Sequence, residues 1–279
     1  MLARRIGGLT ADDPKHFFQT IGGLPFIDEA VRPATLLTAV ACSRRNAVPQ
    51  AHGALTDYLE PGNARALFKR LATSQVEEFD STECSALEQQ EIYTATARIC
   101  EVSPTWRGFF NIPIRYRKLL QRMSSSTSAL IPQTIYLGEQ AFDSAIPLEE
   151  TLVHEHAHIW LNFVMEVYDL QTSQAPRDYV LPSGTPGKTL RGVMAAAHFA
   201  AAALKYYRCL HPSTPDTKRQ VYLQRYLAGC LETAAERPYF TPMGRLVFNA
   251  LTDCHHDLIV YPQGNQPCPK SLLPASSQT

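Results

Sequence analysis

The segment LEETLVHEHAHIWLNFV, residues 148–164, most constrains how this chain can fold. Its run of apolar side chains predicts a helix that is buried on most sides. Within that run lies the array HEHAH at residues 154–158. Burying imidazoles and a carboxylate without partners is costly in free energy. The fold must therefore supply these side chains with a metal ion or with polar partners.

Helical geometry predicts which of the four polar side chains in the array face the same side of the helix. His154 and His158 lie four residues apart, so both imidazoles share one face and can bind one metal ion. Glu155 lies about 100° round the helix from His154 and can reach the edge of the same site. Zinc peptidases use a glutamate at this position as general base for a metal-bound water. His156 lies about 200° from His154, so we expect it to face away.

A third metal ligand has to come from another part of the chain. His198 lies in GVMAAAHFAAAAL, where small alanines would let a second helix pack closely against the first. Three neutral imidazoles on two helices would bind a divalent metal and leave positions open. The simpler interpretation of His198 is a core histidine bonded to a carbonyl. The rival ligands are Glu232 and Glu236, four residues apart in CLETAAERPYF and otherwise expected on a solvated helix surface.

The identity of the metal is open at this level. Three nitrogen ligands suit zinc, iron, nickel or cobalt, whereas a set of two histidines and one carboxylate would favour non-haem iron.

The remaining pattern predicts a mainly α fold (α+β) in which a helical core carries the metal site beside one small sheet, in a single compact domain. Residues 1–130 form an N-terminal helical region that could be a subdomain. Residues 131–260 form the metal-binding catalytic core, with a short strand near 134–137 and helices near 148–168, 190–210, 216–236 and 243–257. Residues 261–279, with several prolines and glycines, predict an irregular tail.

Charge and cysteine content narrow the classes of function. Lys+Arg and Asp+Glu both number 26 in 279 residues, so no basic surface suggests nucleic acid or an anionic membrane as a partner. The seven cysteines form no C-x-x-C pair and are expected to be reduced thiols. No apolar run is long enough to span a bilayer. We expect a cytoplasmic protein with a small-molecule or short-peptide substrate, and a homodimer stays open.

Three motifs between residues 151 and 210 resemble a bacterial family known as HExxH-motif peptide-modification proteins. They are the helix LVHEHAHIWLNFV, the loop YVLPSGTPGKTLRGV, and the following helix RGVMAAAHFAAAALKYYRCL with its single histidine. Members of that family are recognised as 2-oxoglutarate-dependent hydroxylases. The resemblance covers about sixty residues, and little before residue 132 contributes to it.

This resemblance implies Fe(II) held by His154, His158 and His198, with 2-oxoglutarate as cosubstrate. The distal carboxylate of 2-oxoglutarate needs a fixed cation. A bidentate arginine is the best such cation, so Arg191, seven residues before His198, is the first choice and Lys188 the second. The two lie three residues apart, so one helical face could carry both. Lys188 stands where we expect arginine in relatives, which weakens the assignment of the anchor.

The implied activity is hydroxylation of a C–H bond of an amino-acid side chain, free or in a small peptide, in natural-product biosynthesis. Glu155 would then orient a ligand histidine or a metal-bound water. The alternative, which rests on the HExxH array alone, is a zinc metallopeptidase with Glu155 as general base. A third, non-enzymatic reading takes the histidines as a structural metal clip.

Overall fold

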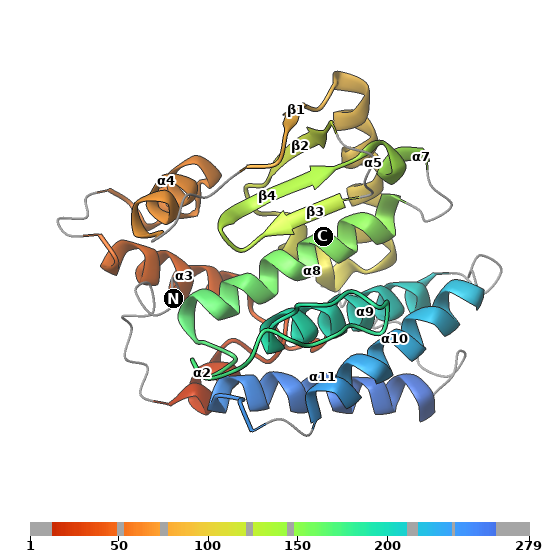
Figure 1. The fold of residues 1–279 in the computed structure, drawn as a ribbon. Helices are drawn as coiled ribbons and strands as arrows, with labels where there is room; N and C mark the ends of the chain where they lie inside the picture. The colour runs from red at the N-terminus through yellow and green to blue at the C-terminus, as the bar shows by residue number, and fades with distance from the viewer. Residues whose placement is uncertain are drawn as a thin grey trace, which may run out of the picture.

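Helix α8, Leu148–Val167, runs through the middle of the molecule with a sheet on one side and three helices on the other (Figure 1). The computed structural model describes residues 13–48, 53–72, 78–120, 125–143, 148–210, 217–235 and 238–260. The three helices beyond α8 are α9 (Leu190–Cys209), α10 (Thr217–Ala235) and α11 (Pro242–Val260). Helix α9 packs directly on α8, and α10 and α11 pack on α9.

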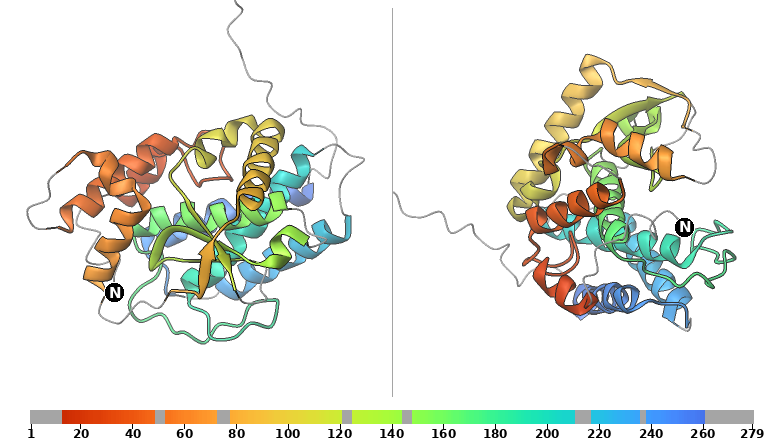
Figure 2. Two further views of the ribbon diagram at one scale, coloured as in Figure 1. Left: turned by 90° about the horizontal axis from the view of Figure 1, so that it is seen from above. Right: turned by 90° about the vertical axis from the view of Figure 1, so that its left-hand side faces the viewer.

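The sheet is small and mixed, with the strand order β1-β2-β4-β3. Its strands are β1 (Ser81–Glu83), β2 (Arg115–Leu119), β3 (Ser125–Ser128) and β4 (Ile131–Leu137). Strand β4 pairs in parallel with β2 and antiparallel with β3, and all seven of its residues are buried. Strand β3 is therefore an edge strand, and it contacts α8. The view from above in Figure 2 shows the strands lying across α8.

The other helices surround this centre. Helices α3 and α5 both pack against α8, and α2 packs against α11. The bounds are α2 (Pro14–Thr20), α3 (Pro33–Asn46), η1 (Leu55–Leu59), α4 (Pro61–Leu71), α5 (Ala86–Val102), η2 (Pro104–Trp106), α6 (Arg107–Phe110) and α7 (Glu139–Asp143).

The prediction of a mainly α fold with one small sheet in a single compact domain is confirmed. One continuous hydrophobic core contains side chains from Phe17 to Leu258. The expected boundary at residue 130 falls between β3 and β4, which pair in the same sheet. The expected irregular tail, 261–279, lies outside the described residues. Across the described segments, no helix has both the length and the apolar character needed to cross a membrane.

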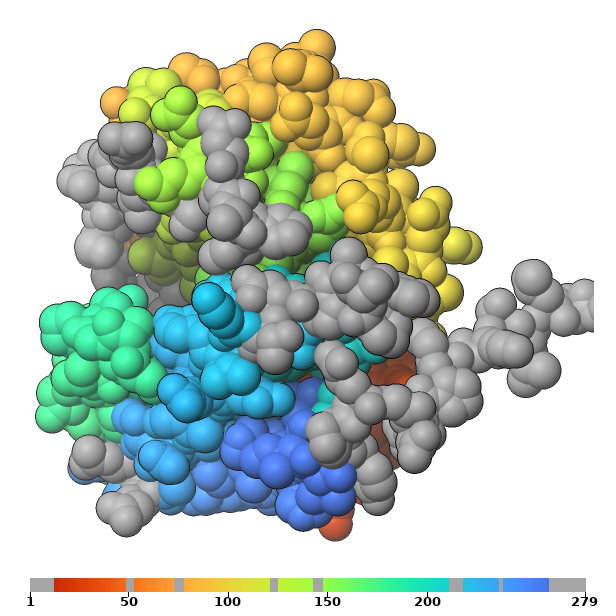
Figure 3. All heavy atoms as spheres, turned by 90° about the vertical axis from the view of Figure 1, so that its right-hand side faces the viewer, coloured from red at the N-terminus to blue at the C-terminus, as the bar shows by residue number. Residues whose placement is uncertain are grey.

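Helix α9 is built to approach α8 closely. The Thr189 hydroxyl caps its N-terminus by accepting a hydrogen bond of 3.1 Å from the Gly192 amide. Alanines at most positions from 195 to 203 favour the helix and leave little bulk between the two axes. The loop before α9 also packs on α10, where Pro182 lies against Gly229. On the face shown in Figure 3, this loop and α10 lie side by side below the sheet.

Candidate active site

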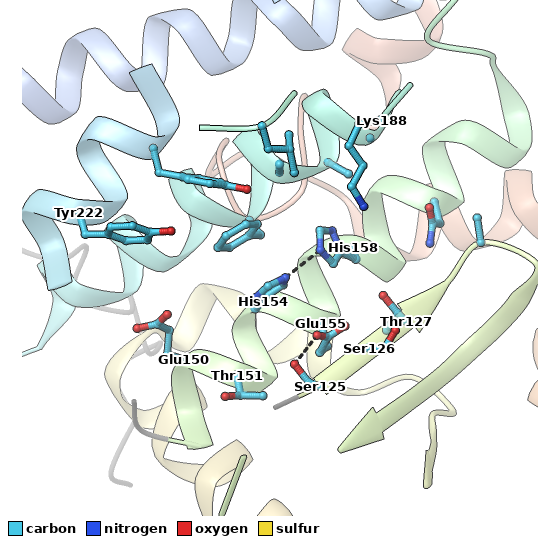
Figure 4. Close-up of a pocket in the computed structure, with 18 of the residues that line it drawn as sticks. Ser125, Ser126, Thr127, Glu150, Thr151, His154, Glu155, His158, Lys188 and Tyr222 are labelled. Carbon is cyan, nitrogen blue, oxygen red and sulfur yellow. Dashed lines mark hydrogen bonds between the residues drawn. The ribbon is translucent and has the colours of Figure 1, made fainter. Parts of the chain in front are cut away.

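A cavity of about 490 Å³ lies between α8, strand β3, α9 and α10 (Figure 4). Its volume is within the range of about 300–1,000 Å³ that is usual for small-molecule sites. Four polar side chains of α8 that line the cavity lie one turn apart, namely Glu150, His154, His158 and Asn162, and Thr151 and Glu155 of the same helix also line it. Residues four apart share a helical face, so the regular spacing in the sequence becomes a polar stripe along the cavity.

His154 and His158 meet inside this cavity. Their Nε2 atoms lie 2.8 Å apart, so one ring donates an N–H to the other. Burial lowers the pKa of His154 to about 3 and also lowers the pKa of His158 well below its usual value. Both rings are therefore neutral at physiological pH, which is the form that binds metals. Two nitrogens about 2.1 Å from one ion and at right angles to each other would be about 3.0 Å apart. The two histidines could therefore occupy two ligand positions of one metal ion if their Nε2 atoms moved slightly apart.

Glu155 is buried beside the histidine pair. Its Oε1 accepts a hydrogen bond of 2.6 Å from the Ser125 hydroxyl on strand β3, and Thr127 also bonds to the carboxyl group. Its Oε2 has no hydrogen-bond partner in the described structure. Burial raises the pKa of Glu155 to about 7, against the opposing effect of these two hydroxyl groups. Glu155 can therefore accept or release a proton near neutral pH.

His156 lies on the opposite side of α8, as the helical period predicts. Its Nε2 lies 2.9 Å from the Tyr116 hydroxyl, and its ring contacts Phe110 at a centroid distance of 4.3 Å. Burial lowers its pKa to about 3. His156 is thus a core histidine that joins α8 to β2 and α6.

His198 does not line the cavity in this structure. Its Nε2 lies 2.7 Å from the carbonyl oxygen of Pro25, which matches the simpler interpretation of a core histidine. The next residue, Phe199, lines the cavity instead, and its ring stacks on His154 at 3.8 Å between centroids. His198 is nevertheless near enough to His158 to lower the pKa of that ring. Among the described residues, no three His, Cys, Asp or Glu side chains are gathered so as to hold a metal ion.

The two candidate cations lie in different places. Lys188 lines the cavity, and in Figure 4 its side chain points toward His158. Arg191 is outside the cavity lining, and its guanidinium lies 4.0 Å from the carboxylate of Asp169. The expectation that one helical face carries both is wrong, because α9 begins at Leu190 and leaves Lys188 in the preceding loop. The geometry favours Lys188 over Arg191 as a cation for a ligand in the cavity.

One of the two rival carboxylates lies away from the site. Glu232 on α10 is exposed, and it acts electrostatically on His255 of α11. Glu236 lies outside the described residues.

A buried ion pair in the cavity was not expected from the sequence. The carboxylate of Glu150 accepts hydrogen bonds from Arg219 on α10 and from the Tyr207 hydroxyl on α9. The guanidinium of Arg219 also lies 5.0 Å from the centre of the Tyr222 ring. The four-residue spacing of Glu150, His154 and His158 is the sequence signal that could have placed Glu150 in the site.

Other cavity residues carried no local signal. Ser125, Ser126 and Thr127 come from a serine-rich edge strand, and Tyr222 and Tyr226 come from α10.

No protein-family model matches this chain, and no curated protein matches it in sequence.

Proposed function

We propose that this protein is an Fe(II)- and 2-oxoglutarate-dependent oxygenase that hydroxylates a C–H bond of an amino-acid side chain, free or within a small peptide. The observation that carries the proposal is the pair His154 and His158, two neutral imidazoles whose Nε2 atoms meet 2.8 Å apart inside a small-molecule cavity. Two partly buried imidazole nitrogens in contact at a cavity wall are better satisfied by a metal ion than by each other.

The positive charge of Lys188 at one end of the cavity supports 2-oxoglutarate as the cosubstrate. Lys188 lies beyond His158 (Figure 4), and the structure records no ion pair for it among the described residues. A dicarboxylate bound beside the histidine pair would place its distal carboxylate near this ammonium group. Lys188 is therefore the proposed anchor in place of Arg191.

His198 stays the proposed third ligand on the strength of the resemblance. To serve, its Nε2 has to leave the Pro25 carbonyl, 2.7 Å away, and turn toward His158. His198 lowers the pKa of His158 electrostatically, which supports a short distance between the two rings. A metal site completed on binding would have a lower affinity than a preformed one, because part of the binding free energy is used in reorganisation.

When bound, iron and 2-oxoglutarate supply the oxidative chemistry, and the protein supplies orientation and a sheltered cavity. Ser125 and Thr127 fix the carboxyl group of Glu155 so that its unpartnered Oε2 is left to orient a group bound beside the pair. Phe199 covers His154 and excludes water from that ring. Lys188 fixes the anionic end of the cosubstrate.

The alternative is a zinc metallopeptidase, and one observation favours it. Glu155 has a free oxygen and a pKa of about 7, which are the properties required of a general base for hydrolysis. Against it, the only described rival carboxylate, Glu232, is exposed outside the cavity.

Anaerobic loading separates the two functions. The purified full-length chain is loaded with Fe(II), and 2-oxoglutarate is added before oxygen. We expect a weak visible charge-transfer band and then oxygen-dependent formation of succinate. An iron-loaded protein that shows neither would overturn the proposal, and peptide cleavage by the zinc-loaded chain would support the alternative.

Variants test the assigned residues. His154→Ala and His198→Ala should each abolish the band and stoichiometric iron binding, whereas His256→Ala, an exposed histidine on α11, should leave both unchanged. Iron binding that survives in His198→Ala would show that His198 is not a ligand. Lys188→Met should raise the concentration of 2-oxoglutarate needed for the band at least tenfold, and Arg191→Met should change it little.

A further inference from the structure

One wall of the cavity is a continuous series of aromatic rings. Tyr222 stacks on Tyr226 at 5.8 Å between centroids, Tyr226 contacts Phe199 at 5.6 Å, and Phe199 stacks on His154 at 3.8 Å. All four residues line the cavity. The series begins at Tyr222, which is 46% exposed, and ends at the histidine pair. A group that packs against this wall therefore lies beside the proposed metal ligands.

Helix α9 leaves room beside the wall. Gly192, Ala195 and Ala196 line the same cavity one turn or two before Phe199. Their spacing of three and four residues places them on one helical face. Because these side chains are small, they leave open space between α9 and the aromatic rings. A larger side chain at any of these positions would narrow the cavity there.

The charges at the aromatic end are balanced. Arg219 and Glu150 neutralise each other there, and the Arg219 guanidinium covers the Tyr222 ring. In Figure 4, Tyr222 and Glu150 lie on one side of His154, and Lys188 lies beyond His158 on the other. The cavity thus has a cationic end and an aromatic end of balanced charge. An uncharged, polarisable group suits the aromatic end, since a charged group would lose hydration without a matching partner.

We propose that the wall formed by Phe199, Tyr222 and Tyr226 binds the aryl side chain of the molecule to be hydroxylated, so that the substrate is an aromatic amino acid, free or within a short peptide. This inference rests on the proposed function for the reaction, but the binding itself needs no metal. Ring-on-ring contacts contribute about 0.5–1.5 kcal/mol beyond the burial of apolar area. The wall therefore predicts a preference of about two- to tenfold for a phenyl group over an aliphatic group of similar size.

Calorimetric titration of the full-length, metal-free chain tests this directly. The probes are N-acetyl-phenylalanine amide and N-acetyl-leucine amide, which share every group except the side chain. We expect the phenyl probe to bind more tightly, and Tyr226→Leu and Tyr222→Leu to remove the preference. The matched control is Tyr93→Leu, which changes a 71% exposed tyrosine on α5 and should preserve the preference.

A plugging variant provides an independent measurement. Ala196→Leu should fill the space beside Phe199 and weaken both probes at least tenfold, whereas Ala235→Leu, at the exposed end of α10, should not. Tyr222 is exposed, so Tyr222→Leu gives a folded test even if Tyr226→Leu does not fold. Equal affinities for the two probes, no binding of the phenyl probe, or a preference that survives Tyr222→Leu would each overturn the inference.

The two proposals fail in different ways. Selective binding of the phenyl probe without succinate formation would remove the oxygenase and leave the aryl site in place. Succinate formation coupled to aliphatic substrates, without a phenyl preference, would remove the aryl site and leave the oxygenase.

Discussion

Two buried carboxylates on helix α8 have opposite surroundings. Glu166, near the end of the helix, receives two hydrogen bonds of 2.7 and 2.8 Å from the guanidinium of Arg44 on α3. The Nη1 group of Arg44 donates two further hydrogen bonds, one to the Tyr58 carbonyl and one to the side-chain oxygen of Gln133 on β4. Glu155, three turns earlier, receives only hydroxyl hydrogen bonds and keeps one oxygen without a partner.

The contrast distinguishes structural from functional polar groups within one helix. A buried network in which every member is bonded fixes α3, α8 and β4 in one arrangement. A buried carboxyl beside two touching histidines, with its pKa raised to about 7, is held in a state that a purely structural role does not require. We infer that the Arg44–Glu166 network stabilises one end of α8, and that this stability allows Glu155 in the middle of the helix to keep an oxygen without a hydrogen-bond partner.

The largest expected effect comes from breaking the complete network. Arg44→Met should lower the free energy of unfolding by about 3–5 kcal/mol, because it leaves the Glu166 charge buried without a partner. Urea unfolding followed by circular dichroism measures the loss. Arg45→Met, an exposed neighbour on the same helix, is the matched control and should change stability by less than about 0.5 kcal/mol. Similar values for the two variants would refute the structural role of the network.

Acid should destabilise the metal-free protein through the histidines. Burial lowers the pKa of His154 and His156 to about 3 and that of His198 to about 4. It also lowers the pKa of His158 well below its usual value. Below pH 6.5 the unfolded chain takes up these four protons while the folded chain does not, so stability falls as pH falls. Glu155 acts in the opposite sense, because its folded pKa of about 7 keeps a proton that the unfolded chain has released.

The net slope near pH 5 is about 4–5 kcal/mol for each pH unit, from four histidines at about 1.4 kcal/mol each less about 1 kcal/mol for Glu155. Urea unfolding between pH 5 and 6.5 with a chelator present measures it. His256→Gln, at an exposed position, should leave the slope unchanged. A stability that does not vary over this range would contradict the neutral state of the four rings.

Sequence alone was enough wherever local periodicity decides the geometry. The pairing of His154 with His158, and the opposite orientation of His156, follow from the helical repeat and hold in the structure. Helix α9 shows where this reasoning stops. Its alanines make it apolar on most faces, so nothing in the pattern decides whether His198 or Phe199 turns toward the cavity. One residue is a rotation of about 100°, and tertiary packing sets it.

Contacts between distant segments were equally hidden. The pairing of Arg44 with Glu166 spans 122 residues, and the hydrogen bond from Ser125 to Glu155 depends on where an edge strand meets α8. Lys188 and Arg191 were expected to be able to share one helical face, but the helix begins between them. Residue spacing is informative only inside an element whose ends are known.

The smallest expected change in the free energy of unfolding is at Glu155, the carboxylate beside the histidine pair. Glu155→Gln should alter the free energy of unfolding by less than about 1 kcal/mol, because the amide oxygen can still accept the Ser125 hydrogen bond and the carboxyl is already partly neutral. Glu166→Gln, the same substitution on the same helix, should cost about 3 kcal/mol because it unpairs Arg44. Activity then discriminates the two functions. Oxygen-dependent succinate formation should persist within tenfold in Glu155→Gln, since Glu155 is not a ligand, whereas a peptidase would lose at least a hundredfold with its general base.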